Sequence, residues 1–146
     1  MILDERLEFC DATALTTAAA GTALEGDVID LGNDGADGNS EDIYLVIQIS
    51  TAVVGPDTVD FKLVSDAQAA IATNGSATQH YSSGAIAVSS LVAGYQVCAV
   101  QLPRGTYERY LGIIRTTVGA GALSAGAINA FLTREPPVQK AFPDGI

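Results

Sequence analysis

Few residues in this chain could support hydrolytic chemistry. His80 is the only histidine, so a serine nucleophile activated by a histidine base would have to be built around it. The residue lies near the end of a polar run, in Gln79-His80-Tyr81, and no partner can be placed beside it from the sequence. We therefore interpret His80 as a surface histidine.

A second candidate for catalysis is the stretch GAGALSAG at Gly119–Gly126. Gly126 follows Ser124 by two residues, but Ala122 stands where a nucleophile elbow needs glycine. A dinucleotide-binding fingerprint would need glycine in place of Ser124, followed by a long helix. We instead predict a hairpin loop between two strands. No complete constellation of nucleophile, base and orienting group is recognisable, so we expect no enzymatic activity and no cofactor.

One segment is rich enough in carboxylates to be considered as a cation site, with acids at Asp30, Asp34, Asp37, Glu41 and Asp42. Calcium needs about six to eight converging oxygen ligands, and these acids do not follow the alternating EF-hand spacing. We predict that Asn33–Asn39 is a mobile, exposed loop and that no metal is bound, with a calcium site as the alternative.

The two cysteines, Cys10 and Cys98, match no metal-binding or redox spacing and are predicted to be buried, reduced thiols. The N-terminal segment MILDERLEF is acidic where a signal peptide needs basic residues and then an apolar run. No apolar run is long enough to span a membrane. We expect the chain to fold in a reducing cytosol and not to bind membranes.

Composition limits the remaining function classes. The chain has 146 residues, 48% of them hydrophobic and 16% charged, with a net charge of −10. This length predicts a single domain with its own core. Residues 1–66 hold 14 of the 17 acidic residues, and the predicted pI is near 4.2, so we expect no nucleic-acid binding. The low charged fraction indicates that a partner covers part of the surface.

Alternation of apolar and polar residues, typical of β-strands, dominates the sequence. In Thr58–Val64 one face is apolar and the other polar, which predicts a peripheral strand with one solvated side. Ile43–Ile49 and Arg109–Thr117 carry apolar residues on both faces, so both of their sides are expected to be at least partly covered. The other expected strands are 85–89, 95–102, 127–133, 6–10 and 27–31.

Gly, Pro and Asn punctuate these segments, which favours an all-β sandwich or barrel of about eight antiparallel strands. Residues 13–23 and 65–72 are rich in alanine, but we allow only a short turn in each. Pro136-Pro137 ends the last strand because proline cannot donate to a strand ladder. The expected organisation is one domain over residues 1–135 and an extended tail over residues 136–146.

Three segments in the second half carry a resemblance to a known family: GAIAVSSLVAGYQ from Gly84, LPRGTYERYLG from Leu102 and GALSAGAINAFLT from Gly121. With the opening MILDERLEFCDATALT and VIDLG at Val28, their order resembles the capsid cement (decoration) proteins of tailed bacteriophages, of the kind first recognised in a Bordetella phage. The most specific feature is the pairing of LPRGTYERYLG with the later GAINAFL.

The resemblance implies a jelly-roll β-sandwich that binds the outside of a phage major-capsid shell between subunits and stabilises it. It implies the phage major capsid protein as partner and the outer capsid surface of the virion as location, after folding in the bacterial host cytoplasm. We also expect a homo-oligomer, with a dimer favoured and a trimer possible, because two-fold assemblies are the commonest. The expectation of an oligomer is based on the apolar second face of Ile43–Ile49 and Arg109–Thr117.

Charged and aromatic residues in LPRGTYERYLG are the candidate capsid or subunit contacts, since such residues are enriched at interfaces. They are Arg104, Tyr107, Glu108, Arg109 and Tyr110. The alternative is that Glu108 and Arg109 form intramolecular pairs and that the tyrosines close the sandwich. The alternative function is a carbohydrate-binding jelly-roll module, because this fold also hosts lectins.

Overall fold

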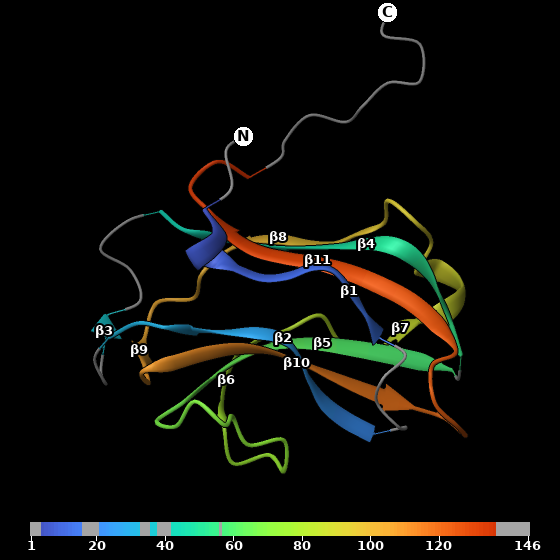
Figure 1. The fold of residues 1–146 in the computed structure, drawn as a ribbon, viewed down its shortest axis with the longest axis horizontal. Coiled ribbons are helices and arrows are strands. Elements are labelled where there is room, and N and C mark those ends of the chain that lie inside the picture. Colours follow the sequence, from blue (N-terminus) through green and yellow to red (C-terminus); the bar gives the residue numbers. More distant parts are fainter. Residues whose placement is uncertain (1–3, 16–20, 33–35, 38–41, 56, 137–146) are drawn as a thin grey trace, which may run out of the picture.

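The computed structural model of this chain describes residues 4–15, 21–32, 36–37, 42–55 and 57–136. Two antiparallel sheets lie face to face (Figure 1). One contains β1 (Glu8–Ala14), β4 (Tyr44–Val54), β8 (Gln96–Gln101) and β11 (Ala125–Thr133). The other contains β2 (Gly21–Asp30), β5 (Thr58–Asp66), β6 (Thr78–Ser82), β7 (Ile86–Ala87) and β10 (Tyr110–Val118).

Strand order identifies the sandwich as a jelly roll. The first sheet has the order β1-β11-β4-β8 and the second β2-β10-β5-β6, with β7 also pairing with β5. Apart from β5, β6 and β7, which follow one another in the second sheet, successive strands of the two sheets therefore alternate between them. The last two, β10 and β11, insert beside β2 and β1, as in two wound Greek keys. This confirms the prediction of an all-β jelly-roll sandwich.

Short elements complete the described part of the chain. The 3-10 turns η1 (Glu5–Leu7) and η3 (Val88–Ser90) precede β1 and β8, respectively. The two-residue strands β3 (Ala36–Asp37) and β9 (Thr106–Tyr107) pair at one end of the sandwich. Residues 65–72 contain no helix, in agreement with the expected turn.

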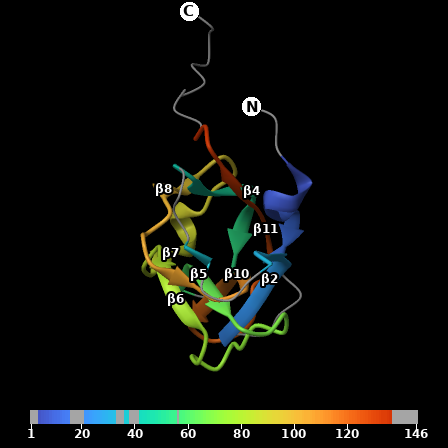
Figure 2. The ribbon, with the colours of Figure 1, turned by 90° about the vertical axis from the view of Figure 1, so that its left-hand side faces the viewer.

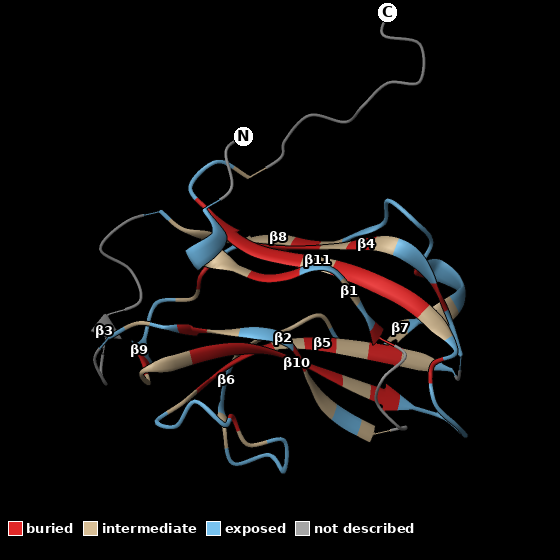
Figure 3. Cartoon of the chain, in the orientation of Figure 1, coloured by how far each residue is buried: buried red, intermediate tan, exposed pale blue. Residues whose placement is uncertain are grey.

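The core lies between the two sheets, because alternate residues of a strand point to the same face. Buried residues occur along the strands of both sheets (Figure 3). Leu45, Ile47 and Ile49 of β4 are buried there, opposite Phe61 and Leu63 of β5. Along β5, the apolar residues Val59, Phe61 and Leu63 are buried and the polar residues that alternate with them are partly exposed. The alternation predicted for this strand is therefore confirmed. The peripheral placement was wrong, because β5 lies between β10 and β6 in its sheet.

The outer face of the second sheet is covered by the chain itself. Ile71, in the β5–β6 connection, packs with Val64 and Ile114 in a second apolar cluster. A Cβ on Gly112 would lie only 2.5 Å from Ile71 Cδ1, which shows how closely the connection covers β10. Both faces of β10 are covered, as expected, but on this face an intramolecular segment does so. This face therefore no longer motivates an oligomer.

The stretch from Gly119 joins strands of different sheets, which corrects the predicted hairpin. β10 ends at Val118 and β11 begins at Ala125, but β10 pairs with β2 and β5 whereas β11 pairs with β1 and β4. The residues between them cross one end of the sandwich. Ser124 anchors the crossing, because its backbone N–H donates a 2.8 Å hydrogen bond to the carbonyl oxygen of Val54.

Candidate functional site

The predicted contact residues lie in the connection that leads from β8 in one sheet to β10 in the other. Residues 102–109 cross the end of the sandwich opposite the Gly119 crossing, and β9 within them pairs with β3 (Figure 1). Leu102 anchors the start of the connection, because its N–H donates to the carbonyl oxygen of Ile43 at 2.8 Å. The N–H of Leu31 donates to the carbonyl oxygen of Arg109 at 2.8 Å and holds its end.

Tyr107 is the internal support of this connection. Its side chain is fully buried, and its hydroxyl donates a 2.6 Å hydrogen bond to the carbonyl oxygen of Pro103. Burial raises the pKa of Tyr107. Because the ring has no exposed surface, Tyr107 cannot contact a capsid directly in this fold and leaves the set of candidate contacts.

The ring of Tyr107 stacks on His80, with ring centroids 3.9 Å apart. Nε2 of His80 shares a 2.8 Å hydrogen bond with Ser65 Oγ, which also accepts from the N–H of Glu108 at 3.1 Å. The interpretation of His80 as a surface residue was therefore wrong. It lies in β6, half-buried, and burial lowers its pKa. Its contacts join β5 and β6 to the β8–β10 connection.

Arg109 forms the intramolecular pair considered as the alternative. Its Nε and Nη2 atoms donate to the two carboxylate oxygens of Asp30, both at 2.9 Å. The guanidinium also lies 5.1 Å from the centroid of the Tyr110 ring. Hydrogen bonds from Arg109 and from the N–H of Gly32 lower the pKa of Asp30 to about 2. Asp30 and Arg109 thus fasten the end of β2 to the start of β10.

The remaining candidate contacts retain solvent-accessible surface. Arg104 is exposed, and Glu108, Arg109 and Tyr110 are partly exposed. These four side chains lie close together in sequence at one end of the sandwich. Their role as capsid contacts stays a prediction.

The acidic segment does not form a recognisable metal site in the described part of the chain. Asp34 and Glu41 lie outside the described residues, as does most of the predicted Asn33–Asn39 loop. Asp30 is paired with Arg109, and Asp42 accepts a 2.7 Å hydrogen bond from the side-chain amide of Gln101. No group of three or more potential metal ligands occurs among the residues that the structure describes.

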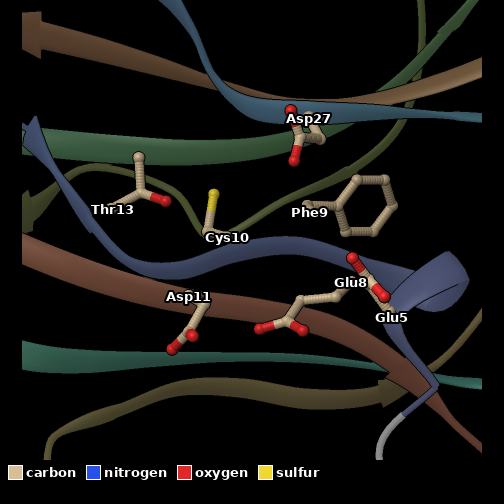
Figure 4. Close-up of a pocket in the computed structure, with 7 residues that line it drawn as sticks. All are labelled: Glu5, Glu8, Phe9, Cys10, Asp11, Thr13 and Asp27. Atoms are coloured by element: carbon tan, nitrogen blue, oxygen red, sulfur yellow. The ribbon is translucent and has the colours of Figure 1, made fainter.

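A groove that the sequence did not reveal separates the edge strands β1 and β2. Its volume is about 450 Å³, and four carboxylate side chains line it, without a basic one, as Figure 4 shows: Glu5, Glu8, Asp11 and Asp27. Cys10, also in its lining, is buried and unpaired, as is Cys98, which confirms the prediction of two buried thiols. Burial raises the pKa of Cys10 to about 12, so its thiol is a poor nucleophile.

A buried ion pair lies inward of this groove. Arg115 Nε donates to Glu25 Oε1 at 2.6 Å, and Nη1 donates to Thr117 Oγ1 at 2.9 Å. The side chains are 0% and 4% exposed, and Nη2 of Arg115 has no hydrogen-bond partner. Burial raises the pKa of Glu25 although Arg115 opposes this effect. We call β1 and β2, with their groove, the acidic side of the sandwich.

On the side of the sandwich opposite β1 and β2 lie β6, β7 and β8 (Figure 2). Residues 67–103 include β6, β7, η3 and β8 and contain no Asp, Glu, Lys or Arg. At the overall charged fraction of 16%, a run of this length would hold about six charged residues. Most of the run is exposed, including Val92 and Tyr95 at 54% and 37%. Residues 67–77 of this run cover the outer face of the second sheet, and residues 78–103 form the side opposite β1 and β2. We call residues 78–103 the uncharged side.

Comparison with known proteins places this fold in a family. A family model described as Bbp16 matches residues 9–132, from the beginning of β1 almost to the end of β11. A search of curated proteins finds no match to the chain. In the described part of the chain, no helix is long and apolar enough to cross a membrane.

Proposed function

The chain belongs to the Bbp16 family, and from this premise we propose that it is a capsid cement protein that binds the outside of a phage major-capsid shell between subunits. The family name points to a Bordetella phage protein, and membership is consistent with a phage structural protein and a component of the virion. The cement role and the outer-surface location are the further steps of the proposal.

The observation that carries the proposal is the extent of the family match over a jelly-roll scaffold. The match spans 124 residues and includes nearly every strand of both sheets, so it concerns the whole sandwich and not one motif. The end formed by residues 102–109 is fixed to the second sheet by the Tyr107–His80 stack and the Arg109–Asp30 pair. The hydrogen bond from Leu102 N–H to the carbonyl oxygen of Ile43 holds it beside the first sheet. A rigid surface of this kind suits binding to a fixed arrangement of subunits, because little ordering entropy is lost.

Stabilisation of a shell follows from selective binding to its assembled state. A protein that binds only correctly juxtaposed subunits shifts the equilibrium by about 2.7 kcal/mol per site at a hundredfold excess over the dissociation constant. An oligomer that contacts several subunits also gains effective concentration, so modest contacts give slow release. We propose a homodimer, with a trimer as the alternative.

Empty shells of the cognate phage provide the test. Wild-type protein should co-sediment with the shells and raise the temperature at which they are disrupted. Arg104→Ala should weaken binding, whereas Arg6→Ala, a matched change of an exposed arginine at η1, should not. A wild-type protein that neither binds the shells nor raises the disruption temperature contradicts the cement role. Binding to a glycan array would favour the carbohydrate-binding alternative.

The same experiment separates the cement role from the choice of contact residues. Alanine variants of Glu108, Arg109 and Tyr110 should each weaken shell binding if this end faces the capsid. Arg109→Ala must first be checked for stability, since it also removes the pair with Asp30. If all four variants bind like wild type, the shell contact lies elsewhere on the sandwich. We also propose that the tail, residues 136–146, lies across a neighbouring subunit as an extended arm. Residues 137–146 lie outside the described residues, and deletion of the tail tests this proposal.

A further inference from the structure

The four outer strand edges of the sandwich are not equally protected against pairing with another chain. Proteins protect exposed edges with charged side chains, bulges and irregular backbone. β1 carries Glu8 and Asp11, its pairing with β11 shifts register twice, and Ala12 has a φ of +46°. β2 carries Asp27 and Asp30, and its pairing with β10 also shifts register. The acidic side is therefore poorly suited to strand addition.

The uncharged side has fewer of these protections. β8 has the sequence QVCAVQ, without charge or proline, and Val97, Ala99 and Val100 are each partly exposed. Its single register irregularity with β4 lies at its N-terminal end, between Gln96 and Cys98. The neighbouring edge of the other sheet is divided between the short strands β6 and β7. β8 is thus the continuous, unprotected edge of this side.

The direction of the free backbone groups follows from the pairing of β8 with β4. The N–H of Leu102 donates to the carbonyl oxygen of Ile43, so this residue faces β4. Backbone groups alternate along a strand, so those of Val100 and Cys98 also face β4 and those of Ala99 and Gln101 face outward. No described residue pairs with this outer edge of β8.

We propose that β8 is the edge through which two copies of this chain pair, joining their β8-containing sheets into one continuous sheet. This inference rests on the proposed function in one respect: it names the surface through which the proposed homodimer forms. Each copy carries a net charge of −10, and pairing through β8 brings together two strands without charged residues, with Asp42 beside Gln101 at one end of each. Contact through the acidic sides would instead oppose carboxylates to carboxylates.

Two-fold symmetry restricts the register of this pairing. Symmetric strands run antiparallel, and residues that face each other across an antiparallel pair have the same hydrogen-bonding direction. The symmetry axis must therefore pass midway between the two copies of one residue. The register centred on Ala99 places Ala99 opposite Ala99 of the second copy and Val97 opposite Gln101 of that copy. The regular part of β8 available to this pairing runs from Cys98 to Gln101, because the irregularity at Val97 interrupts the alternation.

A single substitution tests this surface against a matched control. Ala99→Lys would place two like charges opposite each other at the axis, which is unfavourable in cross-strand pairs. We expect sedimentation equilibrium to show a wild-type dimer, and at least about a tenfold weaker dimer for Ala99→Lys. Ala14→Lys makes the same change on the exposed edge strand β1 and should dimerise like wild type. Net charge alone predicts slightly stronger association for both variants, the opposite of the expected result for Ala99→Lys.

A disulfide tests the register and does not depend on tolerance of lysine. Ala99→Cys should give a covalent dimer on mild oxidation with oxidised glutathione, because directly opposed residues lie within disulfide reach. Ala14→Cys should not, and the native cysteines are buried with raised pKa values, so they react slowly. A monomeric wild type, a dimer unaffected by a folded Ala99→Lys, or no covalent dimer for Ala99→Cys overturns the proposal. Shell binding by a monomeric chain would leave the cement role intact, whereas a β8 dimer that ignores shells would contradict only that role.

Discussion

The acidic and uncharged sides of the sandwich both close the gap between the same two sheets, but they do so with different interactions. On the acidic side, β1 and β2 approach at Gly26 and leave a carboxylate-lined groove, with the Arg115–Glu25 pair inward of it. On the uncharged side, Tyr81 and Cys98 lie close together, and His80 stacks on Tyr107. The acidic side is thus held together mainly by electrostatic interactions and the uncharged side mainly by packing. Their surfaces differ in the same way, since the first is rich in carboxylates and the second has no charged residue.

The largest expected effect breaks the acidic side from within. Glu25→Ala leaves the Arg115 guanidinium buried without its counter-ion, and we expect a loss of about 3–5 kcal/mol in the free energy of unfolding. Urea denaturation measures the loss. The double variant Glu25→Leu with Arg115→Met removes both charges and should be much closer to wild type. A Glu25→Ala variant as stable as wild type would mean that the pair is not buried in solution.

Close approach of β1 and β2 gives the next largest effect. Gly26 has a φ of +69°, and a Cβ there would lie 1.9 Å from the carbonyl oxygen of Phe9. Gly84, on the uncharged side, has a φ of +72° but nothing within 4 Å of a Cβ. We expect thermal and urea unfolding to show a loss of about 3 kcal/mol for Gly26→Ala and about 1–2 kcal/mol for Gly84→Ala. Equal losses would show that only the backbone angle matters.

A smaller effect on the uncharged side depends on pH. Burial lowers the pKa of folded His80, so the unfolded chain takes up the proton first as the pH falls. The contribution of neutral His80 to the free energy of unfolding should therefore be fully present above about pH 6.5 and should decrease below that pH. His80→Phe keeps a ring beside Tyr107 but cannot titrate, so its stability should change less between pH 7 and 5. Asp30, with a pKa of about 2, loses its contribution only in more acidic solution.

Sequence patterns predicted the sandwich but not its long-range contacts. The alternation in Thr58–Val64 and Ile43–Ile49 is strong because each strand faces the core, so both strands were found. β6 was missed because its residues, TQHYS, are polar and none is fully buried. Arg115 stands out within an apolar run, but its partner Glu25 lies 90 positions away and is brought near only by the pairing of β10 with β2.

The candidate site was predictable to a similar degree. The LPRGTYERYLG segment was singled out as the source of the candidate contacts, and the intramolecular alternative is seen in the burial of Tyr107 and the pairing of Arg109. Stacking on His80 was missed because that histidine was interpreted from its polar neighbours alone. The absence of charge over residues 67–103 is visible in the sequence. To interpret this absence of charge, one must know which strand edges are unpaired, and this is known only from the sheet topology.

The smallest expected effect concerns the groove carboxylates of the acidic side. Asp27 is exposed in a groove that contains three other acids and no base, so Asp27→Asn should relieve repulsion and raise the free energy of unfolding by a few tenths of a kcal/mol at low salt. Screening should remove this gain in about 1 M salt. Asp57→Asn makes the same change at an exposed acid in the β4–β5 connection and should show no comparable salt-dependent gain.

Asp27 also helps to raise the pKa of Cys10, so Asp27→Asn should lower the pKa of Cys10 slightly, which is measurable as faster alkylation of Cys10 at high pH. A loss of stability on neutralising Asp27 would instead mean that this carboxylate makes a favourable contact, and that the groove is not a site of net repulsion.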